Sequence, residues 1–122
     1  MITNAVFLQK KGVLKGPLQF NLVMNVPGSI TGTPRNLQYL VDSLPEGSTW
    51  QVSGIGSSQV TLLTIAIAMG GNVRTGLEDV LTMSKGVPAT NKMLVERVLR
   101  IAEAVGRPIA TADEAREYLS LT

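Results

Sequence analysis

Three segments with the character of β-strands alternate with helical segments along this chain, and that alternation limits the possible folds more than any other feature. The strands are expected at residues 16–28, 48–56 and 72–76. Their starts lie about 25–32 residues apart, which is the length of one strand–helix unit. Because such crossovers join parallel strands, the order predicts an α/β fold, in which helices flank a parallel sheet.

Helices are predicted from apolar periodicity and from residues that favour helix ends. The segments are residues 3–12, 34–44, 57–69, 91–105 and 111–119. Ser57 or Ser58 is expected to cap the helix that ends near Met69, and this almost wholly apolar helix is expected to be buried on most sides. Residues 77–89 are predicted to form a loop.

Three parallel strands are too few for a complete domain of this class, since a barrel needs eight and a doubly wound sheet usually has five or six. The residues of one strand parity are polar: Gln19, Asn21, Gln51, Ser53 and Arg74. A polar inner face is typical of a barrel whose upper lumen is a site. Residues 1–122 are therefore predicted to be the C-terminal part of a TIM (β/α)8 barrel, with no second domain.

Composition excludes several classes of function. The chain of 122 residues has a net charge of +2 and no basic run, which disfavours a nucleic-acid partner. Its longest apolar run, Val60–Met69, is far shorter than the ~20 residues of a membrane span, so no membrane association is expected. No signal peptide is recognised, and a cytoplasmic location is predicted.

The chain contains no histidine and no cysteine. Disulfides and thiolate chemistry are therefore excluded. Zinc sites usually draw on imidazole or thiolate ligands, and this chain can offer only carboxylates. On its own, the chain is predicted to be a poor zinc protein.

Three glycine-containing loops follow the strands, where the active sites of barrels lie. Gly28 stands in "NVPGS", and Gly54, Gly56, Ser57 and Ser58 stand in "SGIGSSQ". The second loop leads into a helix N-terminus, whose free amides suit a phosphate or a carboxylate. An ordinary tight turn with a serine cap explains the same pattern, and both interpretations remain open.

The third loop, "RTGLED", places Arg74, Glu78 and Asp79 close together in an apolar setting. These residues can form a solvated turn, a structural ion pair or the floor of an active site. In an extended chain, Arg74 and Glu78 would be about 13 Å apart. A bend at Gly76 would shorten that distance, and Asp79 can then fold back on Arg74. Spacing alone leaves the alternatives open.

Four phrases carry a resemblance to a known family: "VDSLPEGSTWQVSGIG", "AIAMGGNVRTGLED", "SKGVPATNKMLVERVLRIAEAVGR" and "IATADEAREYL". Together they resemble the β-keto acid cleavage enzymes over essentially the whole chain. The resemblance implies a homo-oligomeric (β/α)8 barrel that uses a divalent metal, usually zinc. Such an enzyme converts a β-keto acid and acetyl-CoA into acetoacetate and a new CoA thioester, a reaction known from lysine degradation. A barrel commonly needs ~250 residues, so this chain corresponds to about half of one.

The family's Arg-x-x-x-Glu-Asp motif falls on Arg74, Glu78 and Asp79. By resemblance, Glu78 is a metal ligand and Asp79 is the acid–base residue paired with Arg74. The other metal ligands of the family are two histidines from the N-terminal half of the barrel. The resemblance therefore implies a zinc site that this chain cannot complete and an enzyme that is inactive without an N-terminal half-barrel.

The chain departs from the family's usual pattern in the loops around this site. Ser57 stands in place of an arginine, Val80 in place of an asparagine, and Asn25 and Ser29 in place of two glycines. These differences bear on the recognition of the CoA phosphates and on the choice of substrate. Residues Gly28, Gly54, Gly56, Ser57 and Ser58 are the candidates for contact with substrate or CoA.

Two other interpretations compete with a catalytic one. The chain can be a non-catalytic half-barrel that binds a partner or self-associates, as open sheet edges and a high apolar content would favour. It can also be a small α/β module that binds an anion through "SGIGSSQ" without a metal.

Overall fold

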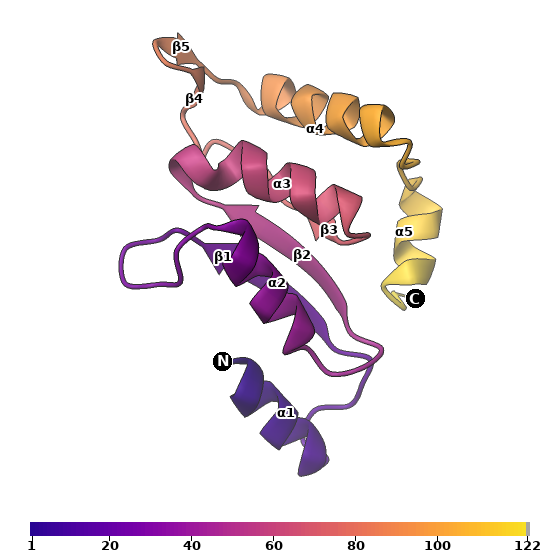
Figure 1. Cartoon of the computed structure of the whole chain (residues 1–122). Coiled ribbons are helices and arrows are strands. Elements are labelled where there is room, and N and C mark those ends of the chain that lie inside the picture. Colours follow the sequence, from indigo (N-terminus) through magenta and orange to yellow (C-terminus); the bar gives the residue numbers. More distant parts are fainter. Residues whose placement is uncertain (122) are drawn as a thin grey trace.

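The computed structural model describes residues 1–121 (Figure 1). Its central sheet has three parallel strands in the order β1 (Gln19–Met24), β2 (Thr49–Gly54) and β3 (Asn72–Val73). β1 and β2 pair along their whole lengths, whereas β3 pairs only with the middle of β2. The predicted parallel α/β sheet is confirmed, although its third strand is shorter than expected.

The predicted helices are all present. They are α1 (Ile2–Lys10), α2 (Pro34–Asp42), α3 (Gln59–Ala68), α4 (Asn91–Val105) and α5 (Ala112–Tyr118). Thr33 caps α2, because its hydroxyl accepts a hydrogen bond from the Asn36 amide at 3.2 Å. Figure 1 shows α2 and α3 over the same face of the sheet and α4 packed on α3, while α1 lies apart. No helix within residues 1–121 is long and apolar enough to cross a membrane.

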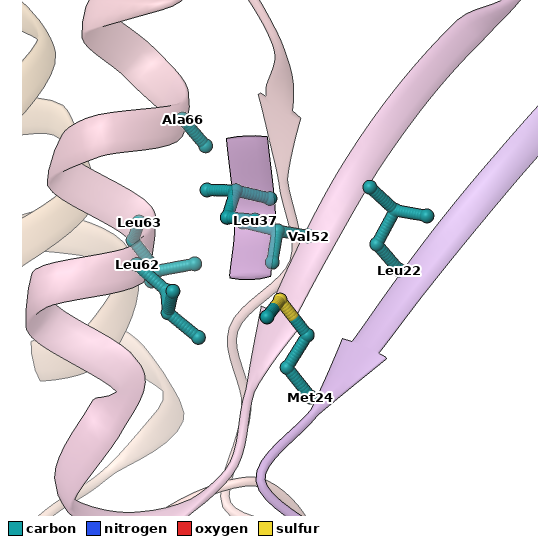
Figure 2. Close-up of a cluster of buried hydrophobic side chains, with 7 residues drawn as sticks. All are labelled: Leu22, Met24, Leu37, Val52, Leu62, Leu63 and Ala66. Atoms are coloured by element: carbon teal, nitrogen blue, oxygen red, sulfur yellow. The ribbon is translucent and has the colours of Figure 1, made fainter. Parts of the chain in front are cut away.

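The hydrophobic core lies between the sheet and its helical layer (Figure 2). The even-numbered positions of β1 and β2 point toward α2 and α3, because successive strand residues face opposite sides. The buried cluster consists of Leu22, Met24, Leu37, Val52, Leu62, Leu63 and Ala66. α3 contributes three of these residues and also contacts α4, which confirms that it is buried on most sides.

The other face of the sheet carries the polar residues, and the end of α5 contacts it near the N-terminal ends of the strands, where the Gln19 side chain donates to the Leu119 carbonyl at 2.9 Å. Ser53 on β2 donates a hydrogen bond from its hydroxyl to the side-chain oxygen of Asn21 on β1 at 3.0 Å. This contact joins neighbouring strands across the polar face. The sheet is thus apolar toward its helices and polar on the side where the candidate site residues lie.

The start of α3 differs from the expected serine cap. A short 3-10 turn, η1 (Gly56–Ser58), precedes the helix, and neither Ser57 nor Ser58 caps α3 with its side chain. Ser58 occupies the N-cap position with helical backbone angles, and its hydroxyl donates to the Ile55 carbonyl at 3.0 Å. The predicted serine at the N-cap is confirmed in position, but it makes no side-chain capping hydrogen bond, because the tight turn directs this hydroxyl back toward the strand.

Residues 77–89 were expected to form a loop but include a small antiparallel hairpin. Its strands are β4 (Thr82–Ser84) and β5 (Val87–Pro88), joined by Lys85 and Gly86. Gly86 has φ +78°, the left-handed conformation that two-residue hairpin turns require and glycine adopts readily. Short strands at this length carry little periodic signal in the sequence.

Gly54, at the end of β2, allows α3 to approach the sheet closely. A Cβ atom there would lie 2.8 Å from the Cα of Gln59 and 3.2 Å from Leu62 Cδ1. We expect Gly54→Ala to lower the free energy of unfolding by about 1–3 kcal/mol, since overpacking forces the helix away from the strand. Urea denaturation of the variant checks this value, with Ser57→Ala in the adjacent exposed turn as the control. Equal midpoints for the two variants would contradict the close approach.

Candidate functional site

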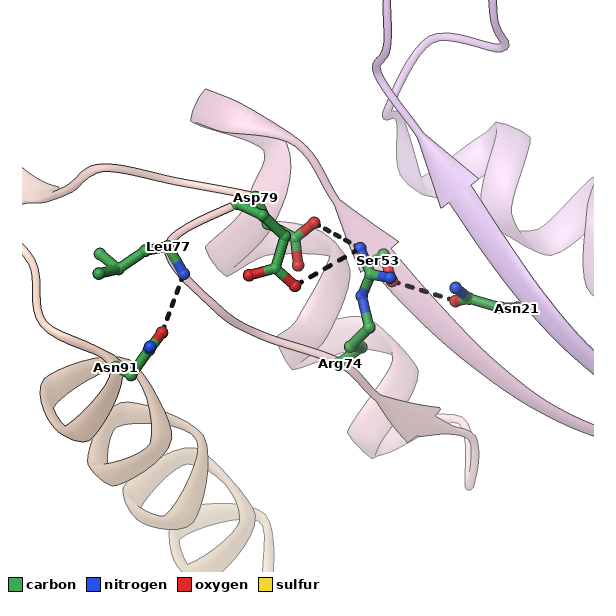
Figure 3. A network of polar contacts seen from close by, with 7 residues as sticks. Asn21, Ser53, Arg74, Leu77, Asp79 and Asn91 are labelled. Atoms are coloured by element: carbon green, nitrogen blue, oxygen red, sulfur yellow. Dashed lines mark hydrogen bonds and ion pairs between the residues drawn. The ribbon is translucent and has the colours of Figure 1, made fainter.

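An arginine and an aspartate form the centre of the candidate site, at the end of β3 (Figure 3). The Nη2 atom of Arg74 lies 2.7 Å from Asp79 Oδ1 and 3.9 Å from Glu78 Oε1. The side chain of Asp79 is 1% exposed, whereas that of Glu78 is 63% exposed. The two neighbouring carboxylates therefore have different environments: one is a buried ion-pair partner, and the other is open to solvent.

Backbone contacts hold the loop that carries Asp79 in a tight turn. The Asp79 amide donates to the Gly76 carbonyl at 3.0 Å, and the Gly56 amide donates to the Asp79 carbonyl at 2.8 Å. The side chain of Asn91 on α4 accepts a hydrogen bond from the Leu77 amide at 3.0 Å (Figure 3). The loop is thus fastened to both the β2–α3 connection and α4.

The sequence left open how close Arg74 lies to the two carboxylates, and the bend at Gly76 answers this. An extended segment would separate Arg74 from Glu78, but the turn brings both carboxylates back toward the guanidinium. Asp79 folds onto Arg74, as the sequence allowed. Asn91, which positions the loop, was missed because an asparagine at a helix start carries no signal of a partner in a distant turn.

The hydrogen bond to Asp79 raises the pKa of the Arg74 guanidinium above its ordinary value. Partial burial opposes this shift, and the negative charges of Asp79 and Glu78 support it. Arg74 is consequently cationic at all physiological pH values. Asp79 is held through Oδ1, while its buried Oδ2 has no hydrogen-bond partner among the described residues. The ion pair with Arg74 therefore engages one carboxylate oxygen of Asp79 and leaves the other without a partner within residues 1–121.

Of the glycine and serine residues predicted to contact substrate or CoA, some line the cavity beside Asp79 and others lie elsewhere in the fold. Gly56 and Ser57 line the same cavity as Glu78 and Asp79. Gly54 is buried beneath α3, and the Ser58 hydroxyl is bonded to the Ile55 carbonyl. Gly28 lies in an exposed turn with φ +83° and does not line the cavity. The structure therefore brings Gly56 and Ser57, but not Gly28, to Asp79.

The donor set of this chain does not by itself fit zinc. Residues 1–121 contain no group of three or more His, Cys, Asp or Glu side chains that could hold a metal ion. Glu78 offers an exposed carboxylate, and the neighbouring Asp79 is engaged by Arg74. Zinc sites in proteins use three or four protein ligands. Glu78 offers one carboxylate, and no further residues within 1–121 complete a ligand set around it.

A cavity of about 700 Å³ opens beside Asp79. Its walls come from the start of α3, the loop of residues 77–81, the β4–β5 hairpin and Arg97 of α4. Sequence reasoning did not foresee this cavity, because two of its walls depend on how the hairpin and α4 fold over the start of α3.

Comparison with known proteins identifies the family. The family model described as beta-keto acid cleavage enzyme matches residues 1–121. The chain is 47% identical to the 3-keto-5-aminohexanoate cleavage enzyme of Acetoanaerobium sticklandii, over 100% of this chain and 45% of that protein. It is 46% identical to the protein of the same name in Fusobacterium nucleatum, over 99% of this chain and 44% of that protein.

A more distant relative carries a different substrate in its name. The chain is 35% identical to the 3-oxoadipate:acetyl-CoA acetyltransferase of Cupriavidus necator, over 99% of this chain and 44% of that protein. The chain thus spans somewhat less than half the length of these relatives. From the match of the family model along nearly its whole length, the chain belongs to the beta-keto acid cleavage enzyme family.

Proposed function

We propose that this chain forms the C-terminal part of an enzyme that converts a β-keto acid and acetyl-CoA into acetoacetate and a new CoA thioester. One observation carries the proposal: a buried aspartate, paired with an arginine, stands at the carboxyl ends of parallel strands, and its second oxygen has no hydrogen-bond partner among the described residues. The names of the relatives, which include β-keto acids and acetyl-CoA, support this class of reaction.

The proposal includes a barrel that this chain shares with an N-terminal half-barrel. A parallel sheet with helices on one face and polar side chains on the other corresponds to an arc of a (β/α)8 barrel. The chain covers 45% of the length of its relative from Acetoanaerobium sticklandii, which supports an arc of about half a barrel. In such a barrel, Asn21, Ser53 and Arg74 would face the lumen. Residues 1–122 would then belong to one domain, and homo-oligomerisation and a cytoplasmic location stay predictions from the sequence.

In the proposed reaction, Asp79 removes a proton from the carbon next to the keto group of the substrate. Arg74 holds the carboxylate through Oδ1 and leaves Oδ2 to accept that proton. The carbanion that results attacks the acetyl carbon of acetyl-CoA, and the CoA thiolate leaves. This thiolate then attacks the original keto carbon, the bond between that carbon and the former carbanion carbon breaks, and the new CoA thioester forms. Acetoacetate is released as its enolate, which takes a proton back from Asp79.

The proposal assigns Glu78 as one ligand of a divalent metal, whose remaining ligands come from the N-terminal half-barrel. Bound there, a metal would polarise the keto group of the substrate. The exposure of Glu78 supports the assignment, since its carboxylate is available at the mouth of the site. No other described residue of the chain joins it in a ligand cluster.

Glu78→Gln tests this assignment in a complex of the chain with an N-terminal half-barrel. We expect the zinc content of the purified complex to fall at least about tenfold, because a neutral amide is a much poorer zinc ligand than a carboxylate. Metal analysis by mass spectrometry measures the content. Glu103→Gln, an exposed change on α4, is the control. Unchanged zinc in the Glu78 variant would exclude it as a ligand.

A second candidate is a half-barrel that self-associates without catalysis. Exposed apolar side chains on and after α1, including Phe7 and Val13, favour this alternative. Analytical ultracentrifugation of the 122-residue chain, with and without the N-terminal half-barrel, separates the two candidates. A single heterodimer that forms acetoacetate from a β-keto acid and acetyl-CoA supports the enzyme. A stable homo-oligomer that neither binds the other half nor forms acetoacetate supports the alternative.

A further inference from the structure

One side chain from a separate helix fastens the loop that carries Glu78 and Asp79. Asn91, the first residue of α4, accepts a hydrogen bond at its Oδ1 atom from the Leu77 amide at 3.0 Å (Figure 3). Leu77 directly precedes Glu78 in the chain, whereas Asn91 lies 14 residues further on. The contact is therefore a link between the site and a distant element, and it is not part of the turn itself.

The turn between Gly76 and Val80 is held at both of its ends. Within it, the amides of Asp79 and Val80 donate to the Gly76 carbonyl at 3.0 and 3.2 Å, so the turn moves as one unit. The Gly56 amide donates to the Asp79 carbonyl at 2.8 Å and fixes one end of this unit to the β2–α3 connection. Asn91 fixes the other end to α4. Without Asn91, the turn can pivot about its contact with Gly56 and about the end of β3.

The ion pair with Arg74 does not by itself fix the direction of the Asp79 carboxylate. Arg74 Nη2 engages Oδ1 at 2.7 Å, and among residues 1–121 neither Asp79 Oδ2 nor Arg74 Nε has a hydrogen-bond partner. A single contact restrains the orientation of a carboxylate less than two parallel hydrogen bonds do. The direction of the unpartnered oxygen consequently depends on the backbone of the turn, and thus on Asn91.

The start of α4 is a firm support for this contact. The hydroxyl of Thr90 accepts a hydrogen bond from the Met93 amide at 3.2 Å and caps the helix. Leu94, in the first turn of the helix, is 1% exposed, and α4 packs against α3. Side chains on packed helices hold a site more precisely than side chains on loops do. Asn91 can therefore transmit the position of α4 to the turn.

We propose that Asn91 is a positioning residue for the base, because its carboxamide oxygen holds the Leu77 amide and thereby directs the Asp79 carboxylate. This inference rests on the proposed function, in which Asp79 takes the proton. It adds a residue that acts through the turn and touches neither substrate. A displacement of about 1 Å at a reacting group can lower a rate about 100-fold, so loss of the contact should reduce turnover more than substrate binding.

Asn91→Ala is expected to lower the turnover number for acetoacetate formation by about 10–100-fold in the complex with the N-terminal half-barrel. The KM values for the β-keto acid and acetyl-CoA should change by less than about threefold, since the lost contact acts on the chemical step. Asn91→Asp should keep turnover within about threefold of the original, because its carboxylate still accepts from the Leu77 amide and suits a helix N-terminus. Steady-state kinetics of the three complexes measures these values.

Gln19→Ala is the matched control. Gln19 also carries an exposed carboxamide that bonds a distant backbone atom, the Leu119 carbonyl at 2.9 Å. It lies at the N-terminal end of β1, at the opposite end of the strands from Asp79, so its loss should leave turnover unchanged. An effect that Gln19→Ala shares with Asn91→Ala comes from the loss of a hydrogen bond in general and not from the site.

Amide hydrogen exchange of the 122-residue chain, followed by NMR, tests the contact without catalysis. The Leu77 amide should exchange about fivefold faster or more in Asn91→Ala, because its hydrogen-bond acceptor is lost. Its exchange should be unchanged in Asn91→Asp and in Gln19→Ala. The ¹³C signal of the Asp79 carboxyl group should move in Asn91→Ala and stay in place in Gln19→Ala.

Unchanged Leu77 exchange or an unmoved Asp79 signal in Asn91→Ala would overturn the proposal. Equal turnover in Asn91→Ala and Gln19→Ala would do the same, as would an Asn91→Asp complex as slow as Asn91→Ala. Failure of the proposed function looks different. The Leu77 and Asp79 signals would then respond as expected, which supports the positioning role, but the original complex itself would form no acetoacetate.

Discussion

Asp79→Asn is expected to lower the turnover number for acetoacetate formation by about 10²–10⁴-fold in the complex with the N-terminal half-barrel. An asparagine keeps the shape of the side chain and can still accept a hydrogen bond from Arg74. It cannot act as a base, because its amide has no free carboxylate oxygen to take the proton. The loss should therefore fall on turnover, while the binding of the substrates and the fold of the loop persist.

Steady-state kinetics with acetyl-CoA and a β-keto acid measure this effect, and zinc content is determined in the same samples. Asp113→Asn is the control, since Asp113 is exposed on α5 and pairs with Arg116 at 2.7 Å. A variant at Asp79 with normal turnover would show that the ion pair is structural. A variant that loses zinc together with turnover would instead place Asp79 among the metal ligands.

Leu63→Ala is expected to lower the free energy of unfolding by about 2–5 kcal/mol, which is the usual cost of a cavity in a packed core. Leu63 is buried on α3, within the cluster that joins this helix to the sheet (Figure 2). Because α3 contacts β2, β3 and α4, a cavity there disturbs the whole helical layer. Chemical denaturation of the 122-residue chain, followed by circular dichroism, measures the change.

Val60→Ala on the same helix provides the comparison. Val60 is 43% exposed, so its truncation should cost no more than about 0.5 kcal/mol. A similar loss of stability in both variants would mean that the helix is not packed against the sheet through the face described here.

The sheet and its orientation follow from features that a single sequence displays. The alternation in β1 separates Leu22 and Met24, which face the helices, from Asn21 on the opposite side. Thr33 caps α2 and Pro34 begins it, which is the order that helix starts favour. Each of these features depends on neighbouring residues, which is why the sequence alone predicts them.

The features that the sequence did not predict depend on contacts between distant segments. The hairpin at residues 82–88 is too short to show periodicity, and Lys85-Gly86 is a weak turn signal. The orientation of Ser58 depends on the 3-10 turn in front of α3. The burial of Gln59 depends on packing around the start of α3, and a glutamine at a helix start is usually exposed.

The sequence allowed Arg74 and Asp79 to lie close together but did not predict the geometry of their contact. The spacing of Arg74 and Asp79 allowed an ion pair, and the bend at Gly76 produces it. The sequence did not distinguish the buried carboxylate of Asp79 from the exposed one of Glu78, because the two are adjacent in the chain. Their different environments are what support a base at one position and a metal ligand at the other.

The most direct test of the proposed reaction follows a labelled carbon. The complex of this chain with the N-terminal half-barrel is incubated with a β-keto acid and acetyl-CoA that carries ¹³C at the acetyl carbonyl, and the products are examined by NMR. If the carbanion formed at Asp79 attacks the thioester, the label appears at the keto carbon of acetoacetate, and the Asp79→Asn complex forms almost none. Acetoacetate without label, or equal labelling by the two complexes, would contradict the account.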